Sequence, residues 1–361
     1  MTTELESLAD VDAHLARVGS LRGCYVQSVD LRERSTALRG VDVTDAMFLG
    51  CLLSQTDRSY LVDAGALVFP ALPDLPFDPY RPSLYTPDEL FRELDHGYPA
   101  TLDARVFAWM TAHLHPGELG AELAATLHDH AITEALEQRL AGIEPASIVG
   151  LLGGHAKARG SDAYRASAEL AARLTASGRL VFSGGGPGAM EAANLGAAFP
   201  GAPDELDAII DQLAAVPSWS DDVGAWAGSA LAQVYSWPTA RLTLGIPTWF
   251  YGHEPPNAFA TGQAKYFNNA IREDALLRLC QGGLVFLPGA AGTVQEIFQA
   301  VTPSYYAKPG AVVPALILVG RDYWTSTLPA WPLLKALARG RSMADRVHLV
   351  DSVDEALGVL G

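Results

Sequence analysis

The chain has 361 residues, of which 49% are hydrophobic and 18% charged, and its formal net charge is −16. A chain of this length and composition can bury a sizeable core, so we expect a globular protein with one large domain or two. The excess of negative charge repels nucleic acid and anionic membranes, and neither is an expected partner.

The apolar and cysteine patterns argue against two further classes. No uninterrupted apolar run approaches the roughly 18 residues of a membrane span, and the start of the chain, MTTELESLADVDAHLARVG, lacks the order of a signal peptide. We therefore expect a cytoplasmic protein. No CxxC pair is present, which argues against a disulfide framework and a structural zinc site; the isolated cysteines are Cys24, Cys51 and Cys280.

Residues 1–140 are predicted to form an acidic α/β extension, whose role the sequence does not indicate. They hold 22 acidic and 10 basic residues. Short apolar runs predict strands, a segment with five prolines predicts an extended stretch, and amphipathic patterns predict helices. The strands are expected within 21–29, 46–54 and 66–70, the extended stretch over 70–82, and the later helices from Thr86 as N-cap, over 107–113 and over 118–140.

Two pairs of histidines in this extension raise the question of a metal site: His113 with His115, and His128 with His130. Residues two apart on a helix point about 200° apart, so neither pair easily binds one metal ion. We expect surface or capping histidines and predict no metal site.

From residue 146 the pattern becomes strand, glycine turn and helix, repeated. The run 147–154 is almost continuously apolar, as in a parallel strand covered on both faces, and it ends in Gly153 and Gly154. A helix over 162–176 and a strand over 180–183 follow. The next turn and helix read GGGPGAMEAAN, from Gly184 to Asn194. Its glycines permit close backbone approach and the helix start offers free N–H groups, so we expect it to bind an anion. The alternative is a tight connection that needs glycine for packing only.

Residues 201–240 form an insertion with predicted helices over 203–215 and 221–235. It contains Trp219, Trp226 and Trp237, which we interpret as packing anchors or subunit contacts, with substrate stacking as the alternative. A strand over 241–246 leads into a loop-rich stretch that is typical of segments covering a site.

The segment LVFLPGAAGTVQE, residues 284–296, is a strand that enters a small-residue turn and then a helix. In the turn, Gly292 permits close approach, and Thr293 can cap the helix or donate its hydroxyl group. We expect Glu296 in the first turn of the helix, where the helix dipole favours the ionised carboxylate. The alternative is a capping box that pairs Thr293 with Glu296.

Together these elements predict a Rossmann-like, doubly wound α/β domain over residues 141–361, with a mostly parallel sheet. The ligand site of such a sheet lies at the carboxyl ends of the strands, where the glycine turns fall. The acidic α/β extension precedes this domain.

The motif SGGGPGAMEAAN, followed later by IRED and LPGAAGTVQE, resembles the LOG family, the cytokinin riboside 5'-monophosphate phosphoribohydrolases that are often mislabelled lysine decarboxylases. The marks of that family are GGGxxGxM and PGGxGTxxE, and the resemblance covers about residues 146–361. The core is also similar to the longer bacterial nucleotide 5'-monophosphate nucleosidases.

The resemblance implies hydrolysis of the N-glycosidic bond of a nucleoside 5'-monophosphate to free base and ribose 5-phosphate, without a cofactor and in a homodimer. The family's essential glutamate and arginine fall on Glu296 and Arg272. Phosphate and ribose contacts are implied for Gly184, Gly185, Gly186, Gly188, Gly289, Ala290, Ala291, Gly292 and Thr293. Possible substrate contacts are Gly153, Gly154, Met190, Glu191 and Asn194.

Two positions depart from the family pattern. Ala290 stands where the second glycine of PGG is expected, which adds a methyl group and costs stability if that position needs a positive φ. Glu273 follows the arginine where shorter members commonly have lysine, which removes a positive charge from the pocket. GGGPGAMEAAN is also similar to molybdenum cofactor carrier proteins, so a non-catalytic carrier of a nucleotide or phosphorylated cofactor is the alternative function. A third is a degenerate core retained for assembly.

Overall fold

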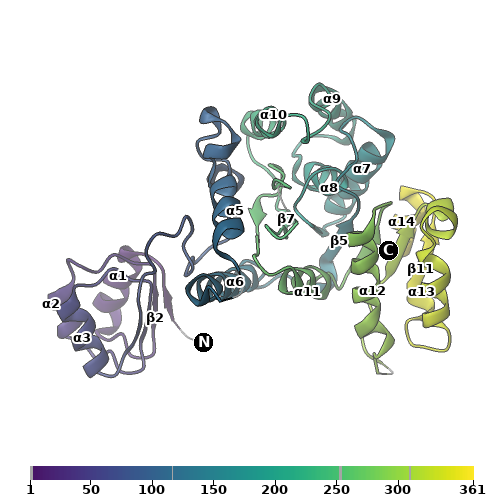
Figure 1. The fold of residues 1–361 in the computed structure, drawn as a ribbon. Helices are drawn as coiled ribbons and strands as arrows, with labels where there is room; N and C mark the ends of the chain where they lie inside the picture. The colour runs from purple at the N-terminus through teal and green to yellow at the C-terminus, as the bar shows by residue number, and fades with distance from the viewer. Residues whose placement is uncertain (1–2, 116, 252–253, 309) are drawn as a thin grey trace. The chain divides into compact units, whose positions relative to one another are not determined.

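The computed structural model describes residues 3–115, 117–251, 254–308 and 310–361 (Figure 1). The chain divides into two compact units. The first consists of Met1–Leu84 with Ala108–Arg139, and the second of Tyr85–Phe107 with Leu140–Gly361. From the sequence, residues 85–107 were expected to belong to the extension that ends near residue 140. In the structure they belong to the second unit.

The first unit is a four-stranded parallel sheet with helices between its strands, in the order β1-β2-β3-β4. The three predicted strands are present but shorter than their apolar runs. The elements are β1 (Glu4–Leu5), α1 (Leu8–Val18), β2 (Tyr25–Gln27), α2 (Ser35–Arg39), β3 (Met47–Leu49), α3 (Gln55–Asp63), β4 (Leu67–Phe69) and α6 (Leu119–Arg139).

The strands of the first unit recur at intervals of about 20 residues, as in repeat proteins. Val26 of β2 pairs with Phe48 of β3, and both are fully buried in one hydrophobic cluster. The thiol of Cys51 donates a hydrogen bond to the carbonyl oxygen of Val26 at 3.3 Å, which ties the two repeats together. This repeat was not foreseen from the sequence.

His128 of α6 corrects the expectation of surface histidines. Its ring is fully buried and packs edge-on against Phe77, with ring centres 5.2 Å apart. Burial lowers the pKa of His128 despite the neighbouring Asp129 carboxylate. His113 is exposed, as expected.

The second unit contains a seven-stranded parallel sheet in the order β11-β10-β9-β5-β6-β7-β8. Its strands are β5 (Ile148–Leu152), β6 (Leu180–Ser183), β7 (Leu244–Gly245), β8 (Gly262–Gln263), β9 (Gly283–Phe286), β10 (Leu316–Val319) and β11 (Val347–Val350). Its helices are α4 (Pro87–Leu90), α5 (Leu102–His113, which continues into the first unit), α7 (Asp162–Ala176), α8 (Ala189–Ala198), α9 (Pro203–Leu213), α10 (Val223–Ser236), α11 (Asn269–Leu279), α12 (Ala291–Tyr305), α13 (Ala330–Ala338) and α14 (Val353–Leu360). Short helical turns are η1 (Leu94–His96), η2 (Tyr98–Ala100), η3 (Pro145–Ser147), η4 (Tyr323–Thr327) and η5 (Ala344–Arg346).

Helices cover both faces of this sheet, so the doubly wound α/β fold is the one predicted. On one face, α7, α8 and α14 bury Val149 and Leu151 of β5. The alternate residue, Gly150, faces Cys280 at the end of α11 on the other side. Because every residue of β5 is buried, its continuous apolar run is explained.

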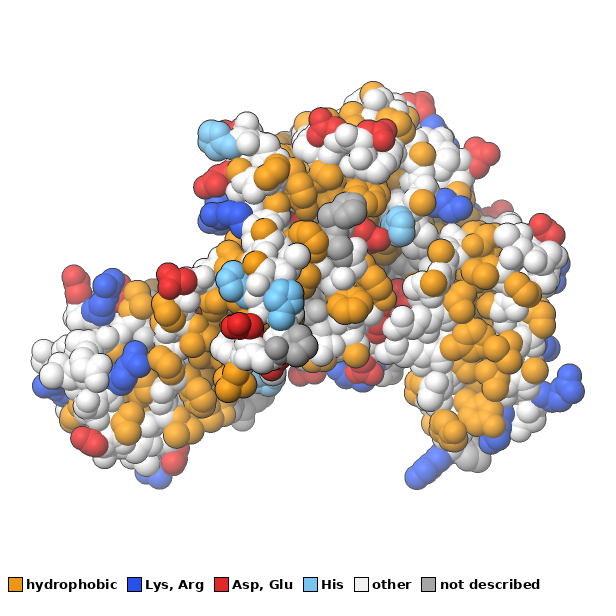
Figure 2. Space-filling model, viewed as in Figure 1, with side chains coloured by type: hydrophobic (Ala, Val, Ile, Leu, Met, Phe, Trp, Pro, Cys, Tyr) orange, Lys and Arg blue, Asp and Glu red, His pale blue; other side chains and the backbone are white. Residues whose placement is uncertain are grey.

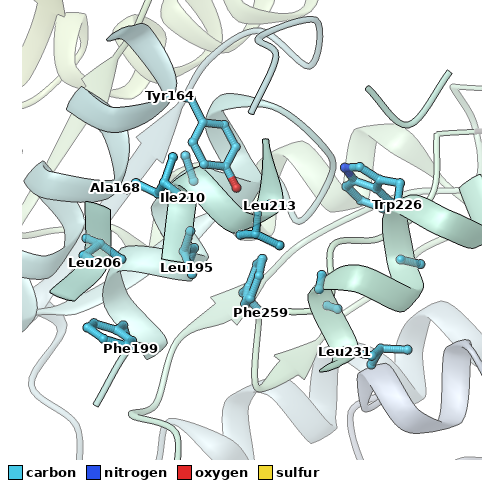
Figure 3. Packing of buried hydrophobic residues seen from close by; sticks show 14 of the residues in the cluster. Tyr164, Ala168, Leu195, Phe199, Leu206, Ile210, Leu213, Trp226, Leu231 and Phe259 are labelled. Carbon is cyan, nitrogen blue, oxygen red and sulfur yellow. The ribbon is translucent and has the colours of Figure 1, made fainter. Parts of the chain in front are cut away.

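A second hydrophobic cluster lies where α7 and α8 meet the insertion helices α9 and α10 (Figure 3). Trp226 of α10 is buried within it, and Trp219 and Trp237 pack against it while partly exposed. The tryptophans therefore act as packing anchors.

Residues 85–107 join the second unit through polar contacts that the sequence did not reveal. Asp103 of α5 accepts hydrogen bonds from Lys265 Nζ at 2.6 Å and from Trp249 Nε1 at 2.8 Å, and Lys265 and Asp103 are almost fully buried. Tyr85 and Gln263 exchange two backbone hydrogen bonds. Burial lowers the pKa of Lys265, and the Asp103 carboxylate opposes that shift.

Exposed apolar side chains gather over α12 and α13, as Figure 2 shows. Tyr306, which follows α12, is 75% exposed, and Leu333 of α13 is 54% exposed. Contiguous exposed apolar surface is typical of interaction sites. The homodimer implied by the family resemblance stays a prediction.

The contact of α7 with α8 provides a test of the fold. A Cβ atom at Gly196 of α8 would overlap the carbonyl oxygen of Ala168 in α7. We expect Gly196→Ala to destabilise the protein by ~2 kcal/mol or more, because the two helices would have to separate. The midpoint of thermal unfolding measures the effect.

Gly358 of α14 supplies the control, since it is exposed and a Cβ atom there meets nothing within 4 Å. Gly358→Ala is expected to leave the midpoint of thermal unfolding unchanged or to raise it. Alanine favours the helix over glycine by up to ~1 kcal/mol of free energy. Equal midpoints for Gly196→Ala and the unaltered protein would contradict the close packing of α7 on α8.

Candidate ligand-binding site

A cavity of about 330 Å³ lies at the carboxyl ends of β5 and β9. These strands are neighbours in the sheet, but the chain continues from β5 to β6 on one side and from β9 to β10 on the other. The loops after them therefore diverge, and such a switch point is where open α/β sheets bind ligands. The cavity is lined by Gly153, Gly154, His155, Ala156, Lys157, Met190, Tyr251, Glu254, Arg272, Glu273, Pro288, Gly289, Ala290, Gly292, Thr293, Glu296 and Tyr323.

The N-terminus of α12 contributes one wall of the cavity. The helix begins at Ala291, and its N-cap residue, Ala290, makes no side-chain hydrogen bond to the first turn. The positive end of the helix dipole is thus present without a side-chain cap, and free N–H groups of this kind bind anions. This wall is the part of the predicted glycine-turn site that the structure retains.

The start of α12 corrects two details of the sequence interpretation. Thr293 is the third residue of the helix and is not its N-cap, so it forms no capping box with Glu296. Glu296 lies in the second turn, where the dipole acts more weakly than at the first. The helix predicted after this turn is α12, which spans Ala291–Tyr305.

Ala290 has a φ of −97°, which any L-residue adopts, so its methyl group strains no backbone. The glycine that the turn requires is Gly289, because a Cβ atom there would overlap the Thr293 hydroxyl group. The substitution of alanine for the second glycine of the family motif is therefore compatible with the turn.

The GGGPG turn does not line the cavity. Its five residues, 184–188, are buried, and Gly188 has a φ of 68°. A Cβ atom at Gly188 would lie 2.6 Å from the carbonyl oxygens of Gly154 and His155. The loop after β5 covers the start of α8, where the Ala189 N–H group donates to the Gly154 carbonyl at 3.2 Å.

The expected pairing of the 184–188 turn with the 289–293 turn is thus replaced by a pairing of the β5 loop with the β9 loop. The physical reason is the strand order, since β5 separates β6 from β9. Gly153 and Gly154, which were possible substrate contacts, line the cavity. The 184–188 turn has the geometry of the alternative interpretation, a tight connection that needs glycine for packing.

The possible substrate contacts on α8 divide in the same way. Met190 lines the cavity. Glu191 is fully buried and forms an ion pair with Arg159, whose Nε atom lies 3.1 Å from both carboxylate oxygens. Asn194 is also fully buried and donates to Thr243 Oγ1 at 2.8 Å. Glu191 and Asn194 therefore act inside the fold, away from the cavity.

Arg272 of α11 is held by protein atoms on every nitrogen of its guanidinium group. Nε donates to the Ile246 carbonyl at 2.6 Å and Nη2 to the Gly184 carbonyl at 3.4 Å. Nη1 lies 2.6 Å from Glu273 Oε1 and 3.4 Å from Glu296 Oε1. These bonds fix the guanidinium beside two carboxyl groups, so the structure brings the two predicted catalytic residues together.

Glu296 is 7% exposed, and burial raises its pKa. The Arg272 guanidinium opposes this shift, the Glu273 carboxylate adds to it, and the pKa reaches about 8. The direction of this shift runs against the expectation of an ionised carboxylate, because it favours the protonated form of Glu296.

Lys157 supplies a cation that the sequence interpretation missed. It lies in the loop directly after β5, is half-buried, and forms no ion pair or hydrogen bond with any residue that the structure describes. The neighbouring His155 pairs with Glu254 at 2.9 Å, and this hydrogen bond raises the pKa of His155. The sequence contained one indication of this role, a basic residue shortly after the two glycines that end the strand.

Three other missed residues come from the segments around the cavity. Tyr251 and Glu254 belong to the loop that was expected to cover a site, and both line the cavity. Tyr323 donates its hydroxyl proton to the Gly289 carbonyl at 2.7 Å, which holds the β9 loop in place.

Within the described ranges the chain shows neither a metal-binding cluster nor a membrane-spanning helix. No three or more His, Cys, Asp or Glu side chains gather there to hold a metal ion. None of the helices in that part of the chain combines the length and the apolar character needed to cross a bilayer.

Two solved structures resemble part of the chain. One is the molybdenum cofactor binding protein from the phototrophic bacterium Rippkaea orientalis, with a TM-score of 0.34, and the other is the Moco carrier protein from Chlamydomonas reinhardtii, with a TM-score of 0.32. Each is 16% identical, and each match covers 59% of this chain and 94% of the other. No family model and no curated protein matches. Similarity of this size assigns the chain to no family, and membership of the LOG family stays a prediction.

The raised pKa of Glu296 predicts how stability depends on pH. Between its ordinary pKa of 4.5 and its folded value of about 8, the folded protein binds a proton that the unfolded chain lacks. Raising the pH through this window therefore lowers the free energy of unfolding. Because Glu296→Gln cannot lose a proton, we expect its midpoint of thermal unfolding to rise relative to the unaltered protein between about pH 5 and about pH 8.

The matched control is Glu118→Gln, which removes a carboxylate at an exposed position of the first unit. It should leave the pH dependence unchanged. A constant difference between Glu296→Gln and the unaltered protein across the pH range, in buffers free of phosphate, would contradict the protonated state of Glu296.

Proposed function

We propose that the cavity binds the phosphate group of a nucleoside monophosphate or of a related phosphorylated small molecule. The observation that carries this proposal is that Lys157 and the N-terminus of α12, which has no side-chain cap, line one cavity at the switch point of the sheet. A helix N-terminus and an ammonium group both stabilise a phosphate, and the diverging loops leave room for one. A volume of about 330 Å³ lies within the range of small-molecule sites.

We further propose a binding or carrier role without catalysis as the first candidate. The guanidinium of Arg272 already has protein acceptors for all its nitrogens, and burial raises the pKa of Glu296 to about 8, which favours its neutral form. Ionised carboxylates stabilise the positive charge that develops during glycoside hydrolysis, and a neutral Glu296 does not.

The second candidate is hydrolysis of the N-glycosidic bond of a nucleoside 5'-monophosphate. It is favoured by one observation, the buried Glu296 whose pKa of about 8 is close to neutral pH. In this reaction the bond between C1' and the base nitrogen breaks, and the Glu296 carboxyl group donates a proton to the departing base. Water adds its hydroxyl group to C1' and returns a proton to Glu296. Glu296 would then be a general acid rather than an ionised stabiliser.

Lys157→Met tests phosphate binding. We expect the variant to bind AMP, GMP, CMP and UMP ~10-fold to ~100-fold more weakly than the unaltered protein, because a charge-assisted hydrogen bond is lost. Isothermal titration calorimetry measures the affinities, and the corresponding nucleosides show how much of the binding depends on phosphate.

Lys308→Met is the matched control, since Lys308 is exposed and does not line the cavity. This substitution removes the same charge from the chain. Equal losses of affinity in the two variants would indicate a general electrostatic effect and would contradict a phosphate contact at Lys157.

Turnover separates the two candidate functions. From the binding role we expect each monophosphate to be recovered intact after long incubation with the purified protein, and no ribose 5-phosphate to appear by chromatography. Release of ribose 5-phosphate that Glu296→Gln abolishes, with binding retained, would establish the hydrolase instead.

A further inference from the structure

Glu273 brings a buried acceptor to the wall of the cavity. Its side chain is fully buried, and Oε1 accepts a hydrogen bond from Arg272 Nη1 at 2.6 Å. The second oxygen, Oε2, is buried and has no hydrogen-bond partner among the described residues. A buried carboxylate oxygen without a hydrogen-bond partner costs free energy. A donor on a bound ligand would remove this cost.

The contacts of Arg272 fix where this acceptor points. The guanidinium is tied to the carbonyl groups of Ile246 and Gly184, which follow β7 and β6. Glu273 is therefore held by a group that cannot move without breaking those bonds. Because this acceptor is already oriented, a ligand with a matching donor binds it without the free-energy cost of ordering the side chain.

Chemistry distinguishes this acceptor from the phosphate site. A fully ionised phosphate group carries negative charge and has no hydrogen-bond donor, so the Glu273 carboxylate repels it. Lys157 and the start of α12, which line the same cavity, attract it instead. A ligand that satisfies both features needs a phosphate and a neutral hydrogen-bond donor. Carboxylates at the switch points of dinucleotide-binding sheets accept hydrogen bonds from ribose hydroxyl groups in this way.

We propose that Glu273 Oε2 accepts a hydrogen bond from a sugar hydroxyl group of the bound ligand, so that the site selects a ribose phosphate over phosphorylated molecules without hydroxyl groups. This inference rests on the phosphate-binding function proposed above. Glu273 is then a specificity-determining residue, because a ligand without the donor would leave Oε2 buried and unpaired.

The test measures affinity for four probes in the unaltered full chain and in Glu273→Gln. The probes are ribose 5-phosphate, its 2-deoxy and 2,3-dideoxy counterparts, and inorganic phosphate, which remove hydroxyl groups stepwise and contain no base. We expect the unaltered protein to prefer ribose 5-phosphate over the dideoxy compound by ~10-fold or more. In Glu273→Gln this preference should largely disappear, while the affinity for inorganic phosphate stays within about twofold.

Asp274→Asn is the matched control, because Asp274 is the next residue on α11 and its side chain is 69% exposed. It should retain the preference for ribose 5-phosphate. Far-UV circular dichroism and the unfolding midpoint check that Glu273→Gln is folded, and the probe series in the unaltered protein tests the preference without any substitution.

The outcomes separate this inference from the function on which it rests. If the unaltered protein binds inorganic phosphate and all three sugar phosphates equally, or if Glu273→Gln keeps the full preference, the role of Glu273 is refuted and phosphate binding stands. If no probe binds at all, phosphate binding itself is refuted.

Discussion

The parallel pairing of β5 with β9 is the constraint on which the candidate site depends. The two strands lie more than a hundred residues apart in the chain, yet Val149 pairs with Gly283 and Leu152 with Phe286. Their carboxyl ends therefore meet at one edge of the sheet. Because the chain leaves these two strands toward opposite sides, their loops diverge and leave the cavity between them. The helix that follows β9 then directs its positive end toward the same space.

Buried electrostatics decide which groups in the cavity remain available for a ligand. A buried guanidinium needs acceptors, and Arg272 takes them from two strand ends and from two glutamates. Burial raises the pKa of one of these glutamates, Glu296. The site thus combines an arginine whose nitrogens all have protein acceptors with a carboxyl group whose pKa is raised, and the positive charge that faces a ligand comes from Lys157 and the helix dipole. This division is the basis of the anion-binding role proposed above.

The glycines of GGGPG show that a turn recognised from the sequence can lie outside the cavity. Their spacing indicates a tight turn between a strand and a helix, and such a turn is present between β6 and α8. Its φ angles and close contacts explain the glycines fully, since the β5 loop rests on Gly188. Which turn faces a ligand depends on which strands are neighbours. Sequence order suggested the loop after β6, whereas the sheet brings the loop after β5 to the site.

Patterns within short segments of the sequence were sufficient to predict much of the fold of the second unit. The sequence by itself determined the alternation of strand, turn and helix in the second unit, the bounds of α7 and β6, and the parallel sheet, because apolar periodicity and glycine punctuation are properties of short segments. The family resemblance singled out Arg272 and Glu296, which the structure brings together. Only the tertiary structure decided the raised pKa of Glu296, the burial of His128, the place of Lys157 at the cavity and the unpaired oxygen of Glu273. Burial and partners arise from residues distant in the chain, and no local pattern encodes them.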